Sequence, residues 1–311
     1  MVKRVAVSAA VITRPDGSFL LGQRAEGTFY PGYWEFPGGK VEAGETPHDA
    51  VVRELAEELG IAVQKAYPWL TREHRYEHAH VKLNFFEIAQ WSGDVKDHVH
   101  SALAWQFADR LDVGPMLPAN GPILKALRLP RLMAITHATE IGIAAQLKAL
   151  EASLAEGLKL VQIREPELSG AALEAFAREV VARCRDTSSM VVINRDRALA
   201  ERLNADGIHL SSAQLAETTS RPALEWVGAS CHTRAELERA AELGMDYAVL
   251  GPVTKTTSHA GQEGIGWSTF AELARDLPVP VLAIGGLSAA DMHAARMAGA
   301  HGVAAIRGAW L

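Results

Sequence analysis

Residues 39–61 of this 311-residue chain read GKVEAGETPHDAVVRELAEELGI. The second half of the stretch predicts a helix, because Val51, Leu55 and Leu59 recur at helical spacing and form one apolar stripe. Gly60 suits the C-terminal cap of that helix, where a left-handed backbone is common. The stretch therefore predicts a glycine-rich loop that leads into a short acidic helix.

Three glutamates, Glu54, Glu57 and Glu58, share one face of the predicted helix. Like charges at this spacing repel each other, so a solvated acidic face gains nothing from them. A divalent cation removes the repulsion, since Mg²⁺ takes oxygen ligands and keeps positions open for water and substrate phosphates. Gly38 and Gly39 lie just before the helix, where glycine lets the backbone approach a metal. We predict a Mg²⁺ site, with Mn²⁺ as an alternative ion.

The spacing of the whole stretch is more specific than its glutamates. The pattern is Gly39, five residues, Glu45, seven residues, Arg53-Glu54, an aliphatic residue, any residue, Glu57-Glu58, any residue, Gly60 and an aliphatic residue. It meets every fixed position of the Nudix box. Residues 1–129 accordingly resemble the MutT-type Nudix hydrolases, which remove pyrophosphate from oxidised purine nucleoside triphosphates such as 8-oxo-dGTP.

The resemblance implies a role for each residue of the box. Glu54, Glu57 and Glu58 would bind Mg²⁺ beside the carbonyl of Gly38 or Gly39, and Arg53 and Glu45 would orient the carboxylates. Water would attack an inner phosphorus of the phosphate chain and release a nucleoside monophosphate and pyrophosphate. Which glutamate accepts the proton stays open. The implied cellular role is nucleotide-pool sanitation, which avoids mutation and belongs to DNA replication and DNA repair.

The resemblance also implies residues that bind the nucleoside triphosphate. It places Arg24 and Lys40 beside the phosphate chain, although either could simply face solvent. It places Phe36 against the base, where the alternative is an ordinary core aromatic. Asn120, in the segment PAN before a predicted helix over residues 123–128, would recognise the base; the alternative is an N-cap of that helix.

Asn120 has the chemistry to tell an oxidised base from an intact one. Guanine shows two acceptors in a row, N7 and O6, whereas 8-oxoguanine carries a hydrogen on N7. A carboxamide offers one donor and one acceptor, so it pairs with both atoms of the oxidised base only.

Two positions depart from the resembled family. Val99 stands where a further metal-binding glutamate is usual, and the substitutes nearby are Asp94, Asp97, His98 and His100. Ala79 stands where some relatives have an arginine that holds the nucleotide. These departures concern the substrate more than the reaction class. His78 and His80 are spaced to bind a metal, but we interpret them as the polar face of a strand over residues 74–88.

Composition bounds the remaining possibilities. The length predicts two domains, and an apolar content of 48% gives each of them a normal core. The net charge of −6 argues against nucleic acid as a partner. Two cysteines and the lack of an 18-residue apolar segment predict a cytoplasmic protein that binds no membrane. Residues 5–12 and 19–23 predict a hairpin around the turn at residues 15–17.

The chain from residue 131 to 311 follows another pattern, short apolar strands that alternate with amphipathic helices. Eight strands are predicted, over residues 132–136, 158–164, 190–194, 207–210, 226–230, 247–251, 279–285 and 302–306. Eight such repeats predict a TIM barrel. The fold class is therefore α/β and α+β, a Nudix α/β/α sandwich followed by a small (β/α)8 barrel.

This barrel resembles the thiamine-phosphate synthase and thiazole tautomerase (TenI-like) family. The resemblance rests on QIRE from Gln162, IN ending at Asn194, ADGIHL containing His209, GASCHT containing His232, GPV from Gly251, and IGG ending at Gly286. It implies a barrel site for a thiazole or pyrimidine phosphate built from Gln162, Arg164, Asn194, His209, His232, Gly285 and Gly286. His232 would act as acid or base, and the alternative for it is a buried structural histidine. Gly285, Gly286 and the backbone after Val303 would cradle phosphate.

Four positions depart from the synthase. Pro166, Arg195, Gln214 and His259 replace two lysines and two aspartates that hold pyrophosphate and Mg²⁺ in that family. The synthase reaction is therefore not expected, and the barrel has a degenerate or altered activity or serves as a scaffold or sensor.

The chain has only four residues after Arg307, so the barrel should lack its last helix. We expect the N-terminal domain or a partner subunit, as in a homo-oligomer, to cover the strands left exposed. The main functional alternative is that the Nudix domain hydrolyses pyrophosphorylated thiamine precursors and supplies the barrel.

Overall fold

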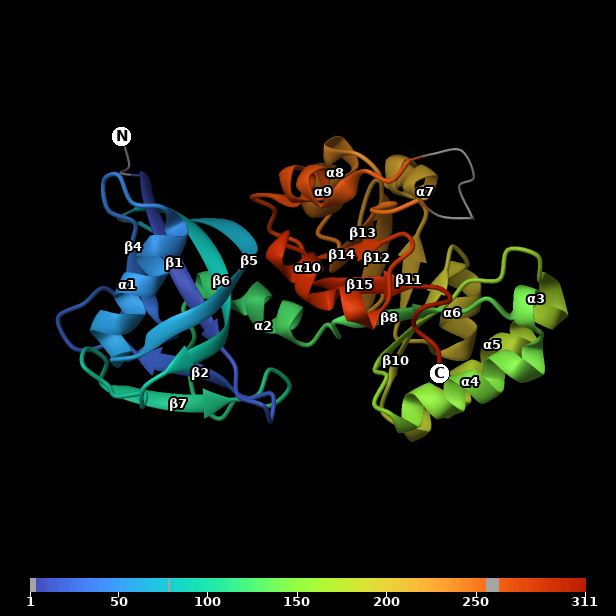
Figure 1. Cartoon of the computed structure of the whole chain (residues 1–311), viewed down its shortest axis with the longest axis horizontal. Coiled ribbons are helices and arrows are strands. Elements are labelled where there is room, and N and C mark those ends of the chain that lie inside the picture. Colours follow the sequence, from blue (N-terminus) through green and yellow to red (C-terminus); the bar gives the residue numbers. More distant parts are fainter. Residues whose placement is uncertain (1–3, 78, 256–262) are drawn as a thin grey trace. The chain divides into compact units, whose positions relative to one another are not determined.

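The computed structural model describes residues 4–77, 79–255 and 263–311. Contacts divide the chain into two compact units, which are coloured by sequence in Figure 1. The first unit comprises Met1–Leu129 with Arg275–Pro278, and the second comprises Pro130–Ala274 with Val279–Leu311. His78 and His259 lie outside the described residues, so the interpretations given to them stay untested.

The first unit contains two sheets. One has the order β4-β1-β6-β5 and is formed by β1 (Arg4–Ile12), β4 (Gly38–Lys40), β5 (Ala62–Arg75) and β6 (His80–Ser92). The other has the order β3-β2-β7 and is formed by β2 (Phe19–Gln23), β3 (Trp34–Glu35) and β7 (Ala102–Gln106). Strand β1 pairs in parallel with β6 and antiparallel with β4.

Three details of the predicted strands are wrong. Strands β1 and β2 form no hairpin ladder, because β2 pairs with β3 and β7 and only the bridge between Thr13 and Phe19 joins the two segments. The Gly38-Gly39 segment is a strand paired with β1 and not a loop. The strand expected over residues 74–88 is two strands, β5 and β6, which meet near Tyr76.

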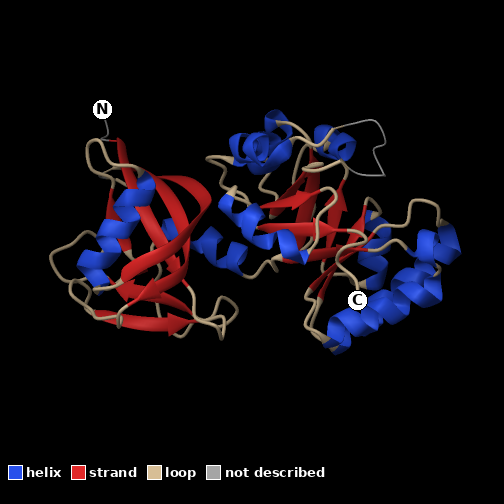
Figure 2. Cartoon of the chain, in the orientation of Figure 1, coloured by secondary structure: helices blue, strands red, loops and turns tan. Residues whose placement is uncertain are grey.

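Alternating side chains place these sheets between two cores. On one face, Ala10 and Ile12 of β1 pack with Leu55 and Leu59 of helix α1 (Pro47–Leu59). On the other face, Ala9 and Val11 pack in the cluster that contains Ile123 and Ala126 of helix α2 (Gly121–Leu127). Since neighbouring residues of a strand point to opposite faces, one strand serves both cores. The predicted α/β/α sandwich is confirmed, with helices and strands shown in Figure 2.

The second unit is a closed barrel of eight parallel strands. They are β8 (Leu132–Ile135), β9 (Leu160–Ile163), β10 (Met190–Asn194), β11 (Gly207–Leu210), β12 (Trp226–Cys231), β13 (Tyr247–Leu250), β14 (Val281–Ile284) and β15 (Gly302–Ala305). The ladder between β15 and β8 closes the barrel. All eight predicted strands are confirmed, because a short buried run between turn residues is a strong signal for a parallel strand.

Helices follow most of the barrel strands. They are α3 (Ala138–Ile141), α4 (Ile143–Ala155), α5 (Gly170–Asp186), α6 (Arg197–Leu203), α7 (Ser212–Glu217), α8 (Arg234–Glu242), α9 (Gly266–Ala274), the 3₁₀ helix η3 (Ala289–Asp291) and α10 (Met292–Met297). In the described part of the chain, no helix is long and apolar enough to cross a membrane.

Residues 306–311, which follow β15, contain no helix, as predicted. Ala309 and Trp310 pack instead against the cluster of buried residues outside β8 and β9. The indole nitrogen of Trp310 donates to the carbonyl of Ile135 at 3.1 Å. The barrel unit therefore covers part of its own open side, which was expected to need another domain or subunit.

Candidate active site

Helix α1 has a cap at each end that fixes where its glutamates stand. The hydroxyl of Thr46 accepts a hydrogen bond from the backbone nitrogen of Asp49 at 3.1 Å, which begins the helix directly after Glu45. Gly60 ends the helix with a left-handed φ of 67°. The two caps enclose Glu54, Glu57 and Glu58 in regular helix, so the predicted spacing on one face is kept.

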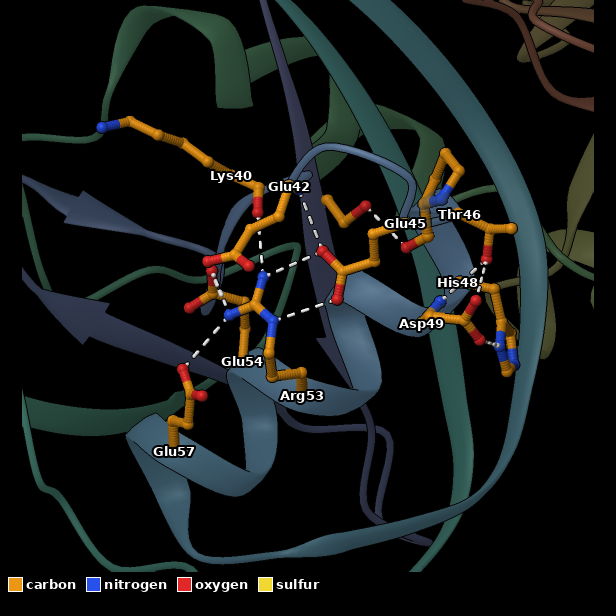
Figure 3. A network of polar contacts seen from close by, with 11 residues as sticks. Lys40, Glu42, Glu45, Thr46, His48, Asp49, Arg53, Glu54 and Glu57 are labelled. Atoms are coloured by element: carbon orange, nitrogen blue, oxygen red, sulfur yellow. Dashed lines mark hydrogen bonds and ion pairs between the residues drawn. The ribbon is translucent and has the colours of Figure 1, made fainter.

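The guanidinium of Arg53 joins these carboxylates to the strand beside them (Figure 3). It donates to both oxygens of Glu45, at 3.0 and 3.1 Å, and to the carbonyl of Lys40 at 3.0 Å. It also contacts Glu54 at 3.0 Å and Glu57 at 3.1 Å. A planar guanidinium makes such contacts in fixed directions. Arg53 and Glu45 therefore lie where the orienting role assigned to them requires.

The two glycines of β4 lie directly against Glu58 and Glu54. The backbone nitrogen of Gly38 donates to Glu58 at 3.0 Å. A Cβ on Gly39 would lie 2.1 Å from a carboxylate oxygen of Glu54, so only glycine leaves room for that carboxylate. Gly38 has a φ of 139°, in a region that side chains rarely adopt. The requirement for two glycines thus has a steric and a conformational cause.

Glu58 lies in a negative and partly dry environment. Burial raises the pKa of Glu58 to about 7, the hydrogen bond from Gly38 opposes the rise, and the charges of Glu54, Glu35 and Asp97 add to it. Several carboxylates close to one buried carboxyl group repel each other, and this repulsion destabilises the site unless a cation is bound. The donor set of Glu54, Glu58 and the adjacent backbone is therefore suited to a hard divalent ion.

Glu57 is placed differently. Its side chain is 60% exposed and is held by Arg53. Within the described residues, no three carboxylate, histidine or cysteine side chains converge as a ready-made metal cluster. Glu54 and Glu58 lie beside the backbone of β4 and are the carboxylates that would hold a Mg²⁺ ion, while Glu54 and Glu57 both contact Arg53 in this structure.

Three of the residues expected to bind substrate, Arg24, Lys40 and Phe36, lie in different surroundings. Arg24 donates to both oxygens of Glu35, at 2.6 and 2.7 Å, so its charge is already paired. Lys40 is exposed, and its ammonium group points away from the carboxylates in Figure 3. Phe36 is 3% exposed and packs in an aromatic cluster, with ring centroids 5.6 Å from Phe19 and 5.8 Å from Phe85. The core interpretation of Phe36 is therefore correct for the protein without ligand.

Asn120 is one of several buried polar side chains that have an atom without a hydrogen-bond partner among the described residues. It is 4% exposed and lies at the end of the 3₁₀ helix η1 (Pro118–Asn120), directly before α2. Asn120 occupies the N-cap position of α2, as the alternative interpretation expected, but its side chain makes no capping hydrogen bond. Its amide nitrogen Nδ2 has no hydrogen-bond partner among the described residues. A buried donor without a partner is costly and points to a missing ligand group.

Two features near this end of the sheet were not predictable from the sequence. One is Glu35, which balances Arg24 and whose pKa is raised by burial. The other is an aromatic group in which Tyr30 lies 5.4 Å from Tyr33 and 5.5 Å from Tyr76. Single charged or aromatic residues in loops carry no periodic signal, so only the fold shows these pairs.

In the barrel, the predicted site residues gather at the carboxyl ends of the strands. Val161, Ile163 and Ile193 pack outward into the helix-facing core, so Gln162 and Asn194 point into the barrel. His209 is 2% exposed and is hydrogen-bonded on both ring nitrogens. Arg164 is exposed beside it, and its positive charge contributes to the lowered pKa of His209.

The remaining barrel residues lie on loops. His232 is half exposed, with Nδ1 3.5 Å from Glu236, so the alternative of a buried structural histidine is wrong. Gly285 and Gly286 both have positive φ values, 115° and 65°, and a Cβ on either would collide with the segment after β13. These glycines are required for the close approach of two backbones.

Comparison with known proteins separates the chain at the same place as the geometry. The family model "NUDIX domain" matches residues 2–127, and "Thiamine monophosphate synthase" matches residues 132–309. The CTP pyrophosphohydrolase of Escherichia coli is 36% identical over 125 residues, covering 40% of this chain and 92% of that protein. A thiamine-phosphate synthase of Lysinibacillus sphaericus is 34% identical over 167 residues, covering 51% of this chain and 78% of that protein.

The chain is a fusion of a Nudix domain and a thiamine monophosphate synthase family domain. Among solved structures, a MutT Nudix hydrolase from Burkholderia pseudomallei is 31% identical and covers 40% of this chain and 97% of that one, with a TM-score of 0.37. The family match and the curated relative make the Nudix domain a hydrolase domain of the class that acts on pyrophosphates.

The departures of the synthase family domain have structural uses. Arg195 has a left-handed φ of 68°, and its carbonyl accepts a hydrogen bond from the side chain of Gln214 at 3.0 Å. Gln214 also forms a capping box with Ser211 at the start of α7. Neither position carries a carboxylate, and Pro166 is exposed. At the two positions where the resembled synthase has Mg²⁺-binding aspartates, this chain therefore has a cation, Arg195, and a helix-capping amide, Gln214.

In the Nudix domain, the segment with Val99 lies beside helix α1. The backbone nitrogen of His98 donates to the carbonyl of Glu58 at 3.0 Å. Val99 itself is 54% exposed, while Asp97 accepts hydrogen bonds from Val99 and His100. Of the residues considered as substitutes for the missing glutamate, Asp97 is thus one whose negative charge raises the pKa of Glu58. Ala79 is buried.

Proposed function

We propose that the Nudix domain is a Mg²⁺-dependent pyrophosphohydrolase of nucleoside triphosphates, with 8-oxo-dGTP as its preferred substrate. The products would be 8-oxo-dGMP and pyrophosphate, and the cellular role nucleotide-pool sanitation. The observation that supports this choice is the buried amide of Asn120, whose Nδ2 has no partner among the described residues. Its side chain makes no capping hydrogen bond to the helix that follows, which supports a role in binding a base.

The amide of Asn120 selects by its pattern of donor and acceptor. Its Nδ2 donates to O6 of the base and its Oδ1 accepts from the N7 hydrogen of 8-oxoguanine. Guanine presents an acceptor at both positions, so the amide oxygen would face a lone pair. Losing one such pairing in a buried site costs about 1–3 kcal/mol. This corresponds to a preference of about 10- to 100-fold for the oxidised nucleotide.

The residues of the box divide the chemistry among themselves. Glu54 and Glu58, beside the backbone of Gly38 and Gly39, would hold Mg²⁺. The ion supplies charge neutralisation for the phosphates and makes a water molecule more acidic. Arg53 keeps Glu54 and Glu57 in place through the contacts that also bind Glu45.

Two other substrates share the donor and acceptor pattern. Cytosine presents an amino group beside a ring nitrogen acceptor, and the relative from Escherichia coli is named a CTP pyrophosphohydrolase. The aminopyrimidine diphosphate precursor of thiamine presents the same pair of groups, and the fusion to a thiamine monophosphate synthase family domain favours it. In this second candidate function, the Nudix domain would remove thiamine precursors or analogues.

For the barrel we propose binding of a thiazole or pyrimidine phosphate with altered or lost synthase activity. The support is the glycine pair Gly285-Gly286 at the carboxyl end of β14, together with a cation and an amide at positions 195 and 214. We propose Mg²⁺ for the Nudix domain only.

Steady-state hydrolysis with Mg²⁺ tests these proposals. The four substrates are 8-oxo-dGTP, dGTP, CTP and the aminopyrimidine diphosphate, each at the same concentration below KM. We expect 8-oxo-dGTP to be hydrolysed fastest. A faster reaction with CTP would replace the base in our proposal, and a faster reaction with the aminopyrimidine diphosphate would move the function to thiamine metabolism.

A further inference from the structure

Asn120 is followed in the sequence by the residue that most favours loss of a side-chain amide. The chain has four asparagines, and only Asn120 precedes a glycine. The carbonyl carbon of an asparagine side chain can be attacked by the backbone nitrogen of the next residue. A side chain on that next residue hinders the attack, and glycine has none. Gly121 therefore leaves the amide of Asn120 more open to this reaction than the amides of the other asparagines.

The helical backbone of the folded chain keeps the two reacting atoms apart. Ring closure needs Cβ of Asn120 and the nitrogen of Gly121 to be nearly eclipsed about the bond between Cα and the carbonyl carbon. The observed ψ of −20° at Asn120 is far from that arrangement. The backbone nitrogen of Asn120 also donates to the carbonyl of Leu117 at 2.9 Å, which holds the turn. The reaction therefore requires the turn between η1 and α2 to open.

Three features lower the stability of this turn. Gly121 has helical angles, φ −51° and ψ −50°, although it precedes Pro122, and the helical region is disfavoured for a residue before proline. Helix α2 has seven residues, fewer than a helix needs to be stable by itself. The side chain of Asn120 adds no capping hydrogen bond. Such a segment opens locally at a lower free-energy cost than global unfolding, so the attack is open to the native protein.

We propose that Asn120 and Gly121 form a self-modification site, at which deamidation removes the amide that reads the base. The backbone nitrogen of Gly121 gives up its proton and bonds to Cγ of Asn120, and the Nδ2 nitrogen takes up a proton and leaves as ammonia. Water then opens the resulting cyclic imide at either carbonyl and leaves an aspartate or an isoaspartate at position 120. The chain gains water and loses ammonia, so no oxidant or reductant is needed.

The modification changes what the site can recognise, a consequence that rests on the function proposed for the Nudix domain. The donor that pairs with O6 of 8-oxoguanine becomes a carboxylate oxygen, which faces O6 with a lone pair and a negative charge. Isoaspartate also moves a side-chain carbon into the backbone, which disrupts the start of α2. Either product should lower kcat/KM for 8-oxo-dGTP by about 10- to 100-fold.

Peptide mass spectrometry of aged full-length protein tests the modification itself. Trypsin cleaves after Arg110 and Lys125, and the peptide between these sites has Asn120 as its only side-chain amide. After incubation in warm, mildly alkaline buffer, we expect this peptide to gain the mass difference between an acid and an amide. Asn204, which is exposed and precedes an alanine, is the internal control and should convert more slowly. A peptide that keeps its mass in the folded protein, at times when the denatured chain has converted, would overturn the proposal.

Gly121→Ala is the matched variant for the attacking nitrogen. Its methyl group hinders the attack, meets no atom within 4 Å, and favours the helical backbone. The fresh variant should hydrolyse 8-oxo-dGTP as fresh wild type does, and it should keep this activity during the incubation. Equal rates of conversion in the two proteins would show that the nitrogen of Gly121 is not the attacking group.

Hydrolysis assays on the same aged samples test the consequence separately. Wild type should lose kcat/KM for 8-oxo-dGTP in proportion to the converted fraction. Asn120→Asp, which has one of the two products at that position, should be about 10- to 100-fold slower than fresh wild type. Conversion without loss of 8-oxo-dGTP hydrolysis would refute the base-reading role of Asn120, and with it the proposed function, while the modification site itself would stand.

Discussion

Gly39 shows at the scale of one residue why the acidic box requires its glycine. The carboxylate of Glu54 occupies the space that any side chain at position 39 would need. Arg53 holds the same carboxylate from the other side at 3.0 Å. The position of the Glu54 carboxylate is therefore set before any metal binds, by the space that Gly39 leaves open and by the positive charge of Arg53.

Gly39→Ala should weaken metal binding by about 10- to 100-fold, the range found when groups that orient metal ligands are altered. The added methyl group must displace the Glu54 carboxylate, which would lie 2.1 Å from it. Paramagnetic resonance of Mn²⁺ measures this without turnover. Gly121→Ala is the matched control, because a Cβ there meets nothing within 4 Å. Unchanged Mn²⁺ affinity in Gly39→Ala would refute the placement of Glu54.

His209 predicts a pH dependence of stability. Burial lowers the pKa of His209 from 6.5 to about 3. Between these two pH values His209 is protonated in the unfolded chain but neutral in the folded barrel. The stabilisation is present above about pH 6.5 and is lost as the pH falls toward 3, by up to about 1.4 kcal/mol per pH unit. Denaturant unfolding of wild type and His209→Asn at about pH 7 and about pH 5 measures it. Wild type should lose more stability than the variant, and equal losses would contradict the assignment.

Short-range patterns made part of the candidate site predictable. The glutamates, glycines and Arg53 stand at fixed spacings on one helix and the strand before it, so sequence alone placed them together. The pairing of Arg24 with Glu35 joins residues on two strands and needs the fold. The free amide of Asn120 was equally hidden, since an asparagine before a helix is usually a cap.

For the secondary-structure elements, the positions of the strands along the chain were predicted more accurately than the strands with which they pair. Alternation and turn residues located residues 4–12 and 19–23 almost to their ends. The partner of a strand depends on contacts distant in sequence, so the short turn between them wrongly predicted a hairpin. The barrel strands escaped this error, because in a barrel of parallel strands joined in order each strand pairs with its neighbours along the chain.

The segment after β15 packs on the outer surface of the barrel. Trp310→Ala should destabilise the barrel by about 2–3 kcal/mol, less than for a fully buried aromatic residue, because Trp310 is partly buried and bonded to Ile135. The shift of the barrel unfolding midpoint in denaturant measures the loss. Leu311→Ala is the control, since Leu311 is 72% exposed. Equal unfolding midpoints for the two variants would show that the packing of Trp310 does not stabilise the barrel.

At the scale of the whole molecule, two families with separate chemistry occupy one chain. The Nudix domain and the synthase family domain match over adjacent ranges with four residues between them, 128–131. Each has its own core and its own set of candidate site residues. The fold class of both was predictable because each depends on a repeated or strictly spaced pattern. The substrate was not, because several bases satisfy the single amide of Asn120.

The function of the molecule therefore depends most on what Asn120 recognises. The measurement that tests this most directly is the ratio of kcat/KM for 8-oxo-dGTP to that for dGTP, in wild type and in Asn120→Ala. We expect a ratio of about 10 to 100 or more in wild type. In Asn120→Ala the ratio should fall to near 1, because hydrolysis of 8-oxo-dGTP is lost while dGTP hydrolysis stays nearly unchanged. A wild-type ratio near 1, or an unchanged ratio in the variant, would contradict it.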